Sequence, residues 1–154
     1  MIPYLSPGAG KAFWVLGEML TVKVSGEETG GAWAAMEVTA QVRNGPPPHI
    51  HTREDESFYV VEGQFWFLYG ERTLDAGPGS FVHVPRGTLH TYNNVGTKPG
   101  RLFVIVSPAG LEKFFEELGQ PVTDSASPPP FKMDTDKLTA LARKYGLEIR
   151  MPTG

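Results

Sequence analysis

Three histidines and one glutamate are spaced as the ligands of a single metal ion. His49 and His51 are two residues apart, and Glu56 follows after a short polar turn. His90 lies far along the chain. Side chains alternate between the two faces of a strand, so His49 and His51 point the same way. Imidazole nitrogens and a carboxylate oxygen suit Fe, Ni, Mn, Zn, Co or Cu. The pattern therefore predicts one divalent transition metal ion with coordination positions left for a small molecule.

The residues around these four resemble the two sequence motifs of the cupin superfamily. The first motif runs from His49 to Gly63, with His51 and Glu56 at the spacing of the family's ligands. The second motif is carried, in order, by Gly79, Pro85, Gly87, His90 and Asn94. Resemblance to both motifs implies that the four candidate ligands face the interior of the protein and hold one ion together.

The choice of carboxylate follows from the same resemblance. Glu54 and Asp55 precede Glu56, and Asp55 also fits a looser form of the motif. Only Glu56 leaves six residues before Gly63. Glu56 is therefore the predicted ligand, and Glu54 and Asp55 are predicted to face solvent at the barrel rim. The leading glycine departs from the usual spacing, because Gly45 lies closer to the first histidine and three prolines separate them. This departure affects a turn rather than a ligand.

The elements that must position these residues are short strands. Apolar segments recur at short intervals, and the 18 glycines and 14 prolines supply turns between them. We expect strands at Phe13–Leu16, Leu20–Val24, Trp33–Val42, Phe58–Val61, Phe65–Tyr69, Arg72–Leu74, Phe81–Val84, His90–Asn93 and Arg101–Val106. Such a series is typical of an all-β sandwich or barrel. The cupin resemblance narrows this to a double-stranded β-helix, or jelly-roll barrel, over about residues 12–107.

Two helices are expected after the barrel, in a C-terminal extension at residues 108–154. Apolar residues recur at helical spacing over Leu111–Leu118, and Ser107–Pro108 has the form of an N-cap followed by proline. A second amphipathic stripe covers about residues 134–146. We expect both helices to pack on the outside of the barrel or across one of its openings, within a single domain of residues 1–154.

Composition and charge argue against several classes of protein. The chain has no cysteine, so neither a disulfide scaffold nor a thiolate ligand is available. The net charge is −3 and no basic cluster occurs, so a nucleic-acid partner is not expected. No run of 18 apolar residues occurs and the N-terminal segment lacks the apolar stretch of a signal peptide, so a membrane partner is not expected. We expect a cytoplasmic protein that acts on a small molecule.

Apolar and aromatic side chains are expected to line a pocket beside the ion. Glu56 should share its strand face with Phe58, and His90 should share its face with Tyr92. The further candidates for the pocket are Met36, Phe67 and Phe103. An aromatic pocket with one metal ion suits a flat organic substrate, although for each of these side chains taken alone a role in filling the core is favoured. The remaining histidine, His83, alternates with valines and is expected to face away from the interior.

Within the superfamily, the chain resembles small single-domain cupins of the quercetin-dioxygenase-like type. The segments that carry this resemblance are His51–Gly70, Pro108–Gly119 and Thr139–Glu148. The resemblance implies a metal-dependent dioxygenase that uses O2 to open the ring of a flavonol or a similar enolic aromatic. Glu56 would then be both a metal ligand and the catalytic base that takes the proton of the substrate hydroxyl.

Two other functions stay open on the sequence alone. A non-oxidative isomerase, decarboxylase or cyclase could use the same ion as a Lewis acid. Such an enzyme would need basic side chains to hold anionic groups, whereas the arginines nearest the motifs, Arg53, Arg72 and Arg86, fall in turns. A small-molecule-binding protein without catalysis is the third alternative. Analogy with other small cupins also implies a homodimer, paired through the segments at 13–16 and 20–24.

Overall fold

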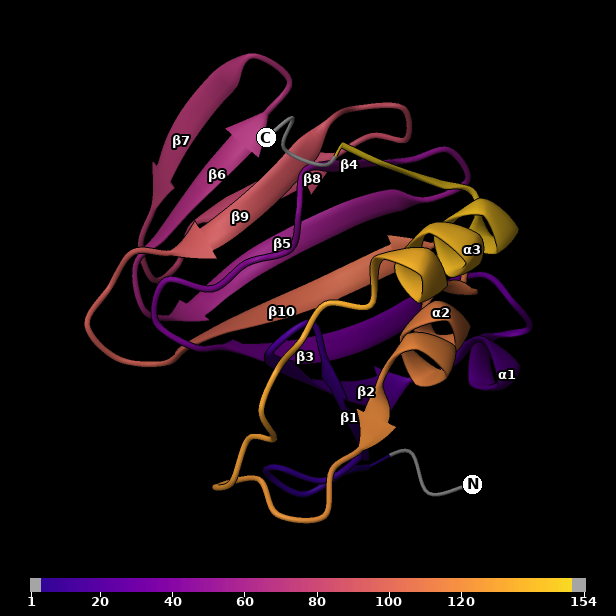
Figure 1. Cartoon of the computed structure of the whole chain (residues 1–154), viewed down its shortest axis with the longest axis horizontal. Coiled ribbons are helices and arrows are strands. Elements are labelled where there is room, and N and C mark those ends of the chain that lie inside the picture. The colour runs from indigo at the N-terminus through magenta and orange to yellow at the C-terminus, as the bar shows by residue number, and fades with distance from the viewer. Residues whose placement is uncertain (1–3, 151–154) are drawn as a thin grey trace.

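The computed structural model describes residues 4–150, which fold mainly into two antiparallel β-sheets (Figure 1). The first sheet has the strand order β11-β1-β2-β3-β10-β5-β8, and the second has the order β12-β4-β9-β6-β7. The strands are β1 (Lys11–Val15), β2 (Glu18–Val24), β3 (Ala34–Ala40), β4 (His49–His51), β5 (Asp55–Glu62), β6 (Phe65–Tyr69), β7 (Arg72–Ala76), β8 (Phe81–Val84), β9 (His90–Asn94), β10 (Gly100–Ser107), β11 (Gln120–Pro121) and β12 (Leu147–Ile149). The helices are α1 (Gly26–Thr29), α2 (Leu111–Leu118) and α3 (Thr135–Tyr145). The expected β architecture with two later helices is confirmed, and the one-turn α1 is an addition.

The central strands of the first sheet bury one face only. On β10, Leu102, Val104 and Val106 are buried, whereas Phe103 and Ile105 alternate with them on the outer face. One-sided burial of this kind is typical of antiparallel sheets that pack on a core through one surface. The inner face of this sheet therefore supplies one wall of the core, and the second sheet supplies the opposite wall.

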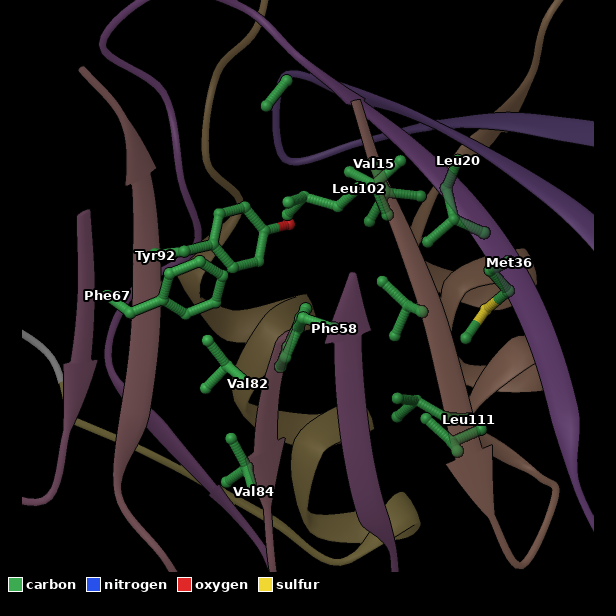
Figure 2. Close-up of a cluster of buried hydrophobic side chains, with 14 of the residues drawn as sticks. Val15, Leu20, Met36, Phe58, Phe67, Val82, Val84, Tyr92, Leu102 and Leu111 are labelled. Atoms are coloured by element: carbon green, nitrogen blue, oxygen red, sulfur yellow. The ribbon is translucent and has the colours of Figure 1, made fainter. Parts of the chain in front are cut away.

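The core between the sheets contains a cluster of aromatic rings (Figure 2). Phe58 on β5 lies edge-on to Phe67 on β6, with ring centroids 5.3 Å apart, and to Tyr92 on β9 at 5.7 Å. Edge-to-face contacts at these distances are favourable beyond the area that they bury. The cluster joins the two sheets. Two of its rings, Phe58 and Tyr92, lie on strands that also carry candidate metal ligands.

The strand β4, which carries two of the candidate ligands, has partners on both sides. His49 pairs with His90 of β9 on one side. On the other side β12 pairs along the whole length of β4, with Leu147 opposite His51 and Ile149 opposite His49. The sequence did not predict β12. This short strand follows α3 in the sequence and forms the edge of the second sheet, next to the strand that carries His49 and His51.

The helices α2 and α3 pack against each other at one end of the sheets (Figure 1). Leu111 and Leu138 are fully buried between the helices and the core. The predicted end of α2 at Leu118 is confirmed, but the predicted N-cap at Ser107–Pro108 is wrong. Ser107 is the last residue of β10 and pairs with Asp55, so the helix begins later, with Gly110 at its N-cap. Within residues 4–150, no helix has the length and apolar character needed to cross a membrane.

The outer edge of β1 is occupied within the chain itself. β1 pairs with β2 on one side and with β11 on the other, where Phe13 lies opposite Pro121 and Trp14 lies opposite Gln120. Pairing between two copies of the chain through this part of β1 would have to displace β11. The homodimer therefore stays a prediction.

Candidate metal centre

The structure brings the four predicted ligands together between the two sheets. The imidazole ring of His90 lies 4.4 Å from that of His49 and 5.2 Å from that of His51, centroid to centroid. Glu56 reaches the same point from the opposite sheet, with Oε1 2.9 Å from Nε2 of His90 and 3.4 Å from Nε2 of His51. The candidate ligand atoms all lie within 4.8 Å of one another, and all four side chains are buried.

Each histidine is oriented by a contact on the ring nitrogen that faces away from the cluster. Nδ1 of His49 lies 2.8 Å from the carbonyl oxygen of Pro47, and Nδ1 of His90 lies 2.9 Å from that of Thr88. Both nitrogens donate to these carbonyls, which leaves Nε2 of each ring with a lone pair for a metal ion. The backbone thus fixes the tautomer that metal binding needs.

The third histidine, His51, is oriented by a carboxylate that the sequence placed elsewhere. Glu54 was predicted to face solvent, and this prediction is wrong, because its side chain is buried with Oε2 3.6 Å from Nδ1 of His51. Glu54 and Glu56 alternate with Asp55 along the chain, so the two-residue period of a strand was the signal that could have placed Glu54 inside. Asp55 does lie at the surface, where it accepts hydrogen bonds from Arg86.

The cluster is electrostatically incomplete without a cation. Neither ring nitrogen of His51 has a hydrogen-bond partner within the described residues, and neither has Oε2 of Glu54. Burial, together with the neighbouring histidines, lowers the pKa of His49 to about 3. Burial alone would lower the pKa of His51, but Glu56 and Glu54 outweigh it and raise that pKa to about 9. A proton on His51 therefore supplies positive charge at neutral pH, in the place that a divalent ion would fill.

The donor set fits a single transition metal ion. Burial alone would raise the pKa of Glu56, but His51 and His90 hold it well below its usual range, so the carboxylate is ionised. Three imidazoles and one carboxylate are the nitrogen and oxygen donors that Fe, Ni, Mn, Zn, Co and Cu accept. The site fits one such ion, whose identity the four ligands leave open.

A cavity opens beside the cluster, and its wall is mostly apolar. Of the five side chains predicted for the pocket, Met36, Phe58 and Tyr92 line it. Phe67 lies behind this wall, with its ring 5.3 Å from that of Phe58. Phe103 points to the outer face of β10, and its neighbour Val104 lines the cavity instead. The sequence did not predict the contributions from the C-terminal helices and β12, which are Phe114, Phe115, Leu138, Leu147 and Ile149.

One further acidic residue lines the cavity, and the sequence did not predict it. Glu18, the first residue of β2, is buried, and Tyr92 donates a hydrogen bond of 2.6 Å from its hydroxyl to Oε2 of Glu18. Burial raises the pKa of Glu18 to about 8, although the Tyr92 hydrogen bond acts in the opposite direction. The carboxyl is therefore neutral at pH 7. Leu20, two residues on, is buried on the same strand, so alternation was the available signal.

Replacing Glu18 with glutamine should remove a pH dependence of stability. The folded protein keeps the Glu18 proton up to about pH 8, whereas the unfolded chain loses it near pH 4.5. The free energy of unfolding should therefore fall, relative to that of E18Q, as the pH rises through this window, by about 1.4 kcal/mol per pH unit at most. Urea unfolding of both proteins from pH 5 to pH 9 measures the difference. Parallel pH profiles would contradict a neutral buried carboxyl.

Known proteins resemble the chain in both sequence and fold. Residues 36–106 match a family model described as a cupin domain. The chain is 24% identical over 153 residues to quercetin 2,3-dioxygenase of Bacillus subtilis, a match that covers 98% of this chain and 45% of that relative. KdgF from Halomonas sp. superimposes with a TM-score of 0.63 at 18% identity, over 71% of this chain and 97% of that one. The cupin domain of Cnp3 from Schizosaccharomyces pombe gives a TM-score of 0.59 at 19% identity, over 73% and 72%. The two structural likenesses concern the fold alone.

Proposed function

We propose that the protein is a metal-dependent dioxygenase for a small enolic aromatic substrate, starting from the match of residues 36–106 to a cupin domain model. The match to quercetin 2,3-dioxygenase supports this reaction type, although the chain spans less than half of that relative's length. The resident ion would be held by His49, His51, Glu56 and His90.

The apolar lining of the cavity carries the proposal. Apart from the three cluster residues His49, His51 and Glu56, and from Glu18 and Tyr92, the described lining residues are hydrocarbon or thioether side chains. None of the described lining residues is lysine or arginine. A non-oxidative enzyme that acts on sugar phosphates or other anions needs such cations to hold its substrate. An uncharged or singly ionised aromatic suits this wall better.

Glu56 is the residue that would handle the substrate proton. When bound, the ion would supply Lewis-acid activation that lowers the pKa of a substrate hydroxyl. Oε1 of Glu56 is the oxygen nearest to His51 and His90, and the hydrogen bond with His90 is made by Oε1 rather than by Oε2. Oε2 is therefore the atom that accepts the hydroxyl proton in this proposal. Because the neighbouring histidines lower the pKa of Glu56, it accepts that proton only when the hydroxyl has itself become acidic.

The size of the cavity narrows the substrate class. Its volume is about 70 Å³, whereas sites for drug-sized molecules measure roughly 300–1,000 Å³. Phe114, Phe115 and Leu138 of the two C-terminal helices form part of the wall. A single-ring enol is therefore favoured, and a flavonol would require these helices to move outward.

Oxygen consumption tests the proposed reaction. The protein, loaded separately with Fe, Ni, Mn or Co, should consume O2 in step with the loss of substrate from a panel of enolic diketones, hydroxypyrones and flavonols. E56Q should lose this activity because its amide cannot accept the proton. Absence of uptake with every metal would contradict the proposal. Turnover without oxygen would favour the non-oxidative alternative, and a ligand recovered unchanged would favour a binding protein.

A further inference from the structure

We propose that Glu18 is a substrate-positioning residue whose free carboxyl oxygen donates a hydrogen bond to an oxygen acceptor on the substrate, at a distance from the metal cluster. This inference rests on the proposed function, because it assigns a second polar anchor to the same cavity. A hydrogen bond from Glu18 would favour substrates that carry an acceptor oxygen, such as a carbonyl, on the side of the ring away from the metal-binding hydroxyl.

The position of Glu18 separates it from the metal ligands. Glu18 is on β2 and Glu56 is on β5, and β3 and β10 lie between them in the same sheet. The three candidate histidine ligands come from the opposite sheet. Both polar positions open on one cavity, so a single molecule can contact the cluster with one group and Glu18 with another.

Phe58 occupies the space between these two positions. Its ring centroid lies 6.0 Å from that of His90 and 5.7 Å from that of Tyr92. The Tyr92 hydroxyl points away from Phe67 and toward the region of Val15 and Leu102 (Figure 2), and Val15 is the strand partner of Glu18. The Phe58 ring lines the cavity and is therefore placed to contact the ring of a substrate held at both ends.

The hydrogen bonds of Glu18 leave one oxygen available. Oε2 accepts the hydroxyl proton of Tyr92. Oε1 has no hydrogen-bond partner within residues 4–150. Unlike Oε2 of Glu54, it is not fully enclosed by protein atoms. Oε1 therefore faces the cavity. A neutral carboxyl that accepts at one oxygen can carry its proton on the other, which makes Oε1 a hydrogen-bond donor.

A purely structural role would not need this arrangement. The Tyr92 hydrogen bond joins the two sheets, and any acceptor at position 18 could serve that purpose. An open donor on an otherwise apolar wall is a means of fixing the orientation of a ligand, because a buried donor left without a partner costs free energy. Glutamine at position 18 would keep both the acceptor for Tyr92 and a donor for the ligand, whereas methionine would keep the volume alone.

Binding of two matched catechols to the zinc-loaded protein tests the inference. Both catechols bind the ion through the same pair of oxygens, but 4-acetylcatechol carries a carbonyl oxygen where 4-ethylcatechol has a methylene group. The acetyl group also makes the hydroxyls more acidic, so each preference is expressed relative to that of aqueous zinc for the same two catechols at the same pH. Zinc is redox-inactive, so calorimetric titration measures binding without turnover. The wild-type protein should prefer 4-acetylcatechol by about tenfold at pH 6.5, the value of one hydrogen bond. E18Q should keep this preference and E18M should lose it.

The pH dependence of the preference provides a second test, which compares wild type with E18Q and does not require the E18M variant. The titratable groups that share the cavity with Glu18 are Tyr92, His49, His51 and Glu56, and these are common to wild type and E18Q. Above about pH 8 the ionised Glu18 can no longer donate, so the wild-type preference should disappear while that of E18Q persists. This comparison still decides the matter if E18M does not fold.

Several results would overturn the inference. One is an equal preference for 4-acetylcatechol in wild type and E18M. Another is a wild-type preference that does not change with pH, and a third is the failure of the wild type to bind either catechol. If the protein consumed oxygen but showed no preference between the catechols, the role of Glu18 would be refuted and the dioxygenase proposal would stand. A clear preference without oxygen uptake under any metal would refute the dioxygenase and leave the binding role of Glu18 intact.

Discussion

Replacing His90 with alanine is expected to deprive the protein of its metal ion and to lower turnover by roughly a thousandfold or more. His90 is almost fully buried and touches all three other candidate ligands. Alanine at this position removes one of four donors and leaves a gap that the backbone cannot close. Metal ions contribute several kcal/mol to the stabilisation of charge in a transition state, which corresponds to two to four orders of magnitude in rate.

Metal content after dialysis and the rate of oxygen uptake measure this effect. His83→Ala is the matched control, since His83 is an exposed histidine on β8 whose Nδ1 lies within hydrogen-bond distance of the hydroxyl of Ser57. That variant should keep both metal and activity. If the His90 variant bound one equivalent of metal as tightly as the wild type, His90 would not be a ligand.

Replacing Gly45 with alanine is expected to destabilise the fold by about 3 kcal/mol. A Cβ atom at this position would lie 1.8 Å from the carbonyl oxygen of Tyr92 and 2.8 Å from its carbonyl carbon. Both are backbone atoms of β9, which cannot rotate away as a side chain can. The chain here is also held in place, because Asn94 donates from its backbone nitrogen to the carbonyl oxygen of Asn44. Relief of the clash must therefore displace β9.

Urea unfolding measures the stability change, and Gly77→Ala is the matched control. A Cβ atom at Gly77 would meet only the flexible end of the Gln64 side chain, with Nε2 at 2.9 Å. That variant should unfold near the wild-type midpoint. Because β9 carries His90, the Gly45 variant should also bind metal more weakly than the control. A wild-type midpoint for the Gly45 variant would show that β9 yields at little cost.

The sequence predicted the strands best where a turn and an apolar run coincide. The bounds of β6 and β8 agree with the prediction, because turns that contain glycine flank both apolar runs. His83 was predicted to face outward, and the structure confirms this, because valines on either side of it are buried. The three histidines and Glu56 come together as predicted, since the two motifs specify their positions on β4, β9 and the facing strand β5.

The misses have identifiable physical causes. The run from Leu102 to Val106 is apolar at every position, so its sequence cannot reveal which face is buried, and Phe103 was assigned to the wrong one as a result. β12 is only three residues long, so its own sequence does not predict a strand. It becomes a strand by pairing with β4, which lies far from it in the sequence. Alternation along β2 could have placed Glu18 inside, but its neutral state depends on the surrounding cavity, which no local pattern encodes.

The pairing of β12 with β4 has a consequence for the order of folding. The contacts that seat the end of β4 include one from Thr52 to Gly146, residues separated by 94 positions in the chain. Contacts of such large sequence separation carry a high loop-closure cost and form slowly. We therefore expect the strand that holds His49 and His51 to gain its second neighbour late in folding, together with the docking of α3. Metal capture should be among the last kinetic events of folding, and the rate of metal uptake should report on the docking of the C-terminal helix.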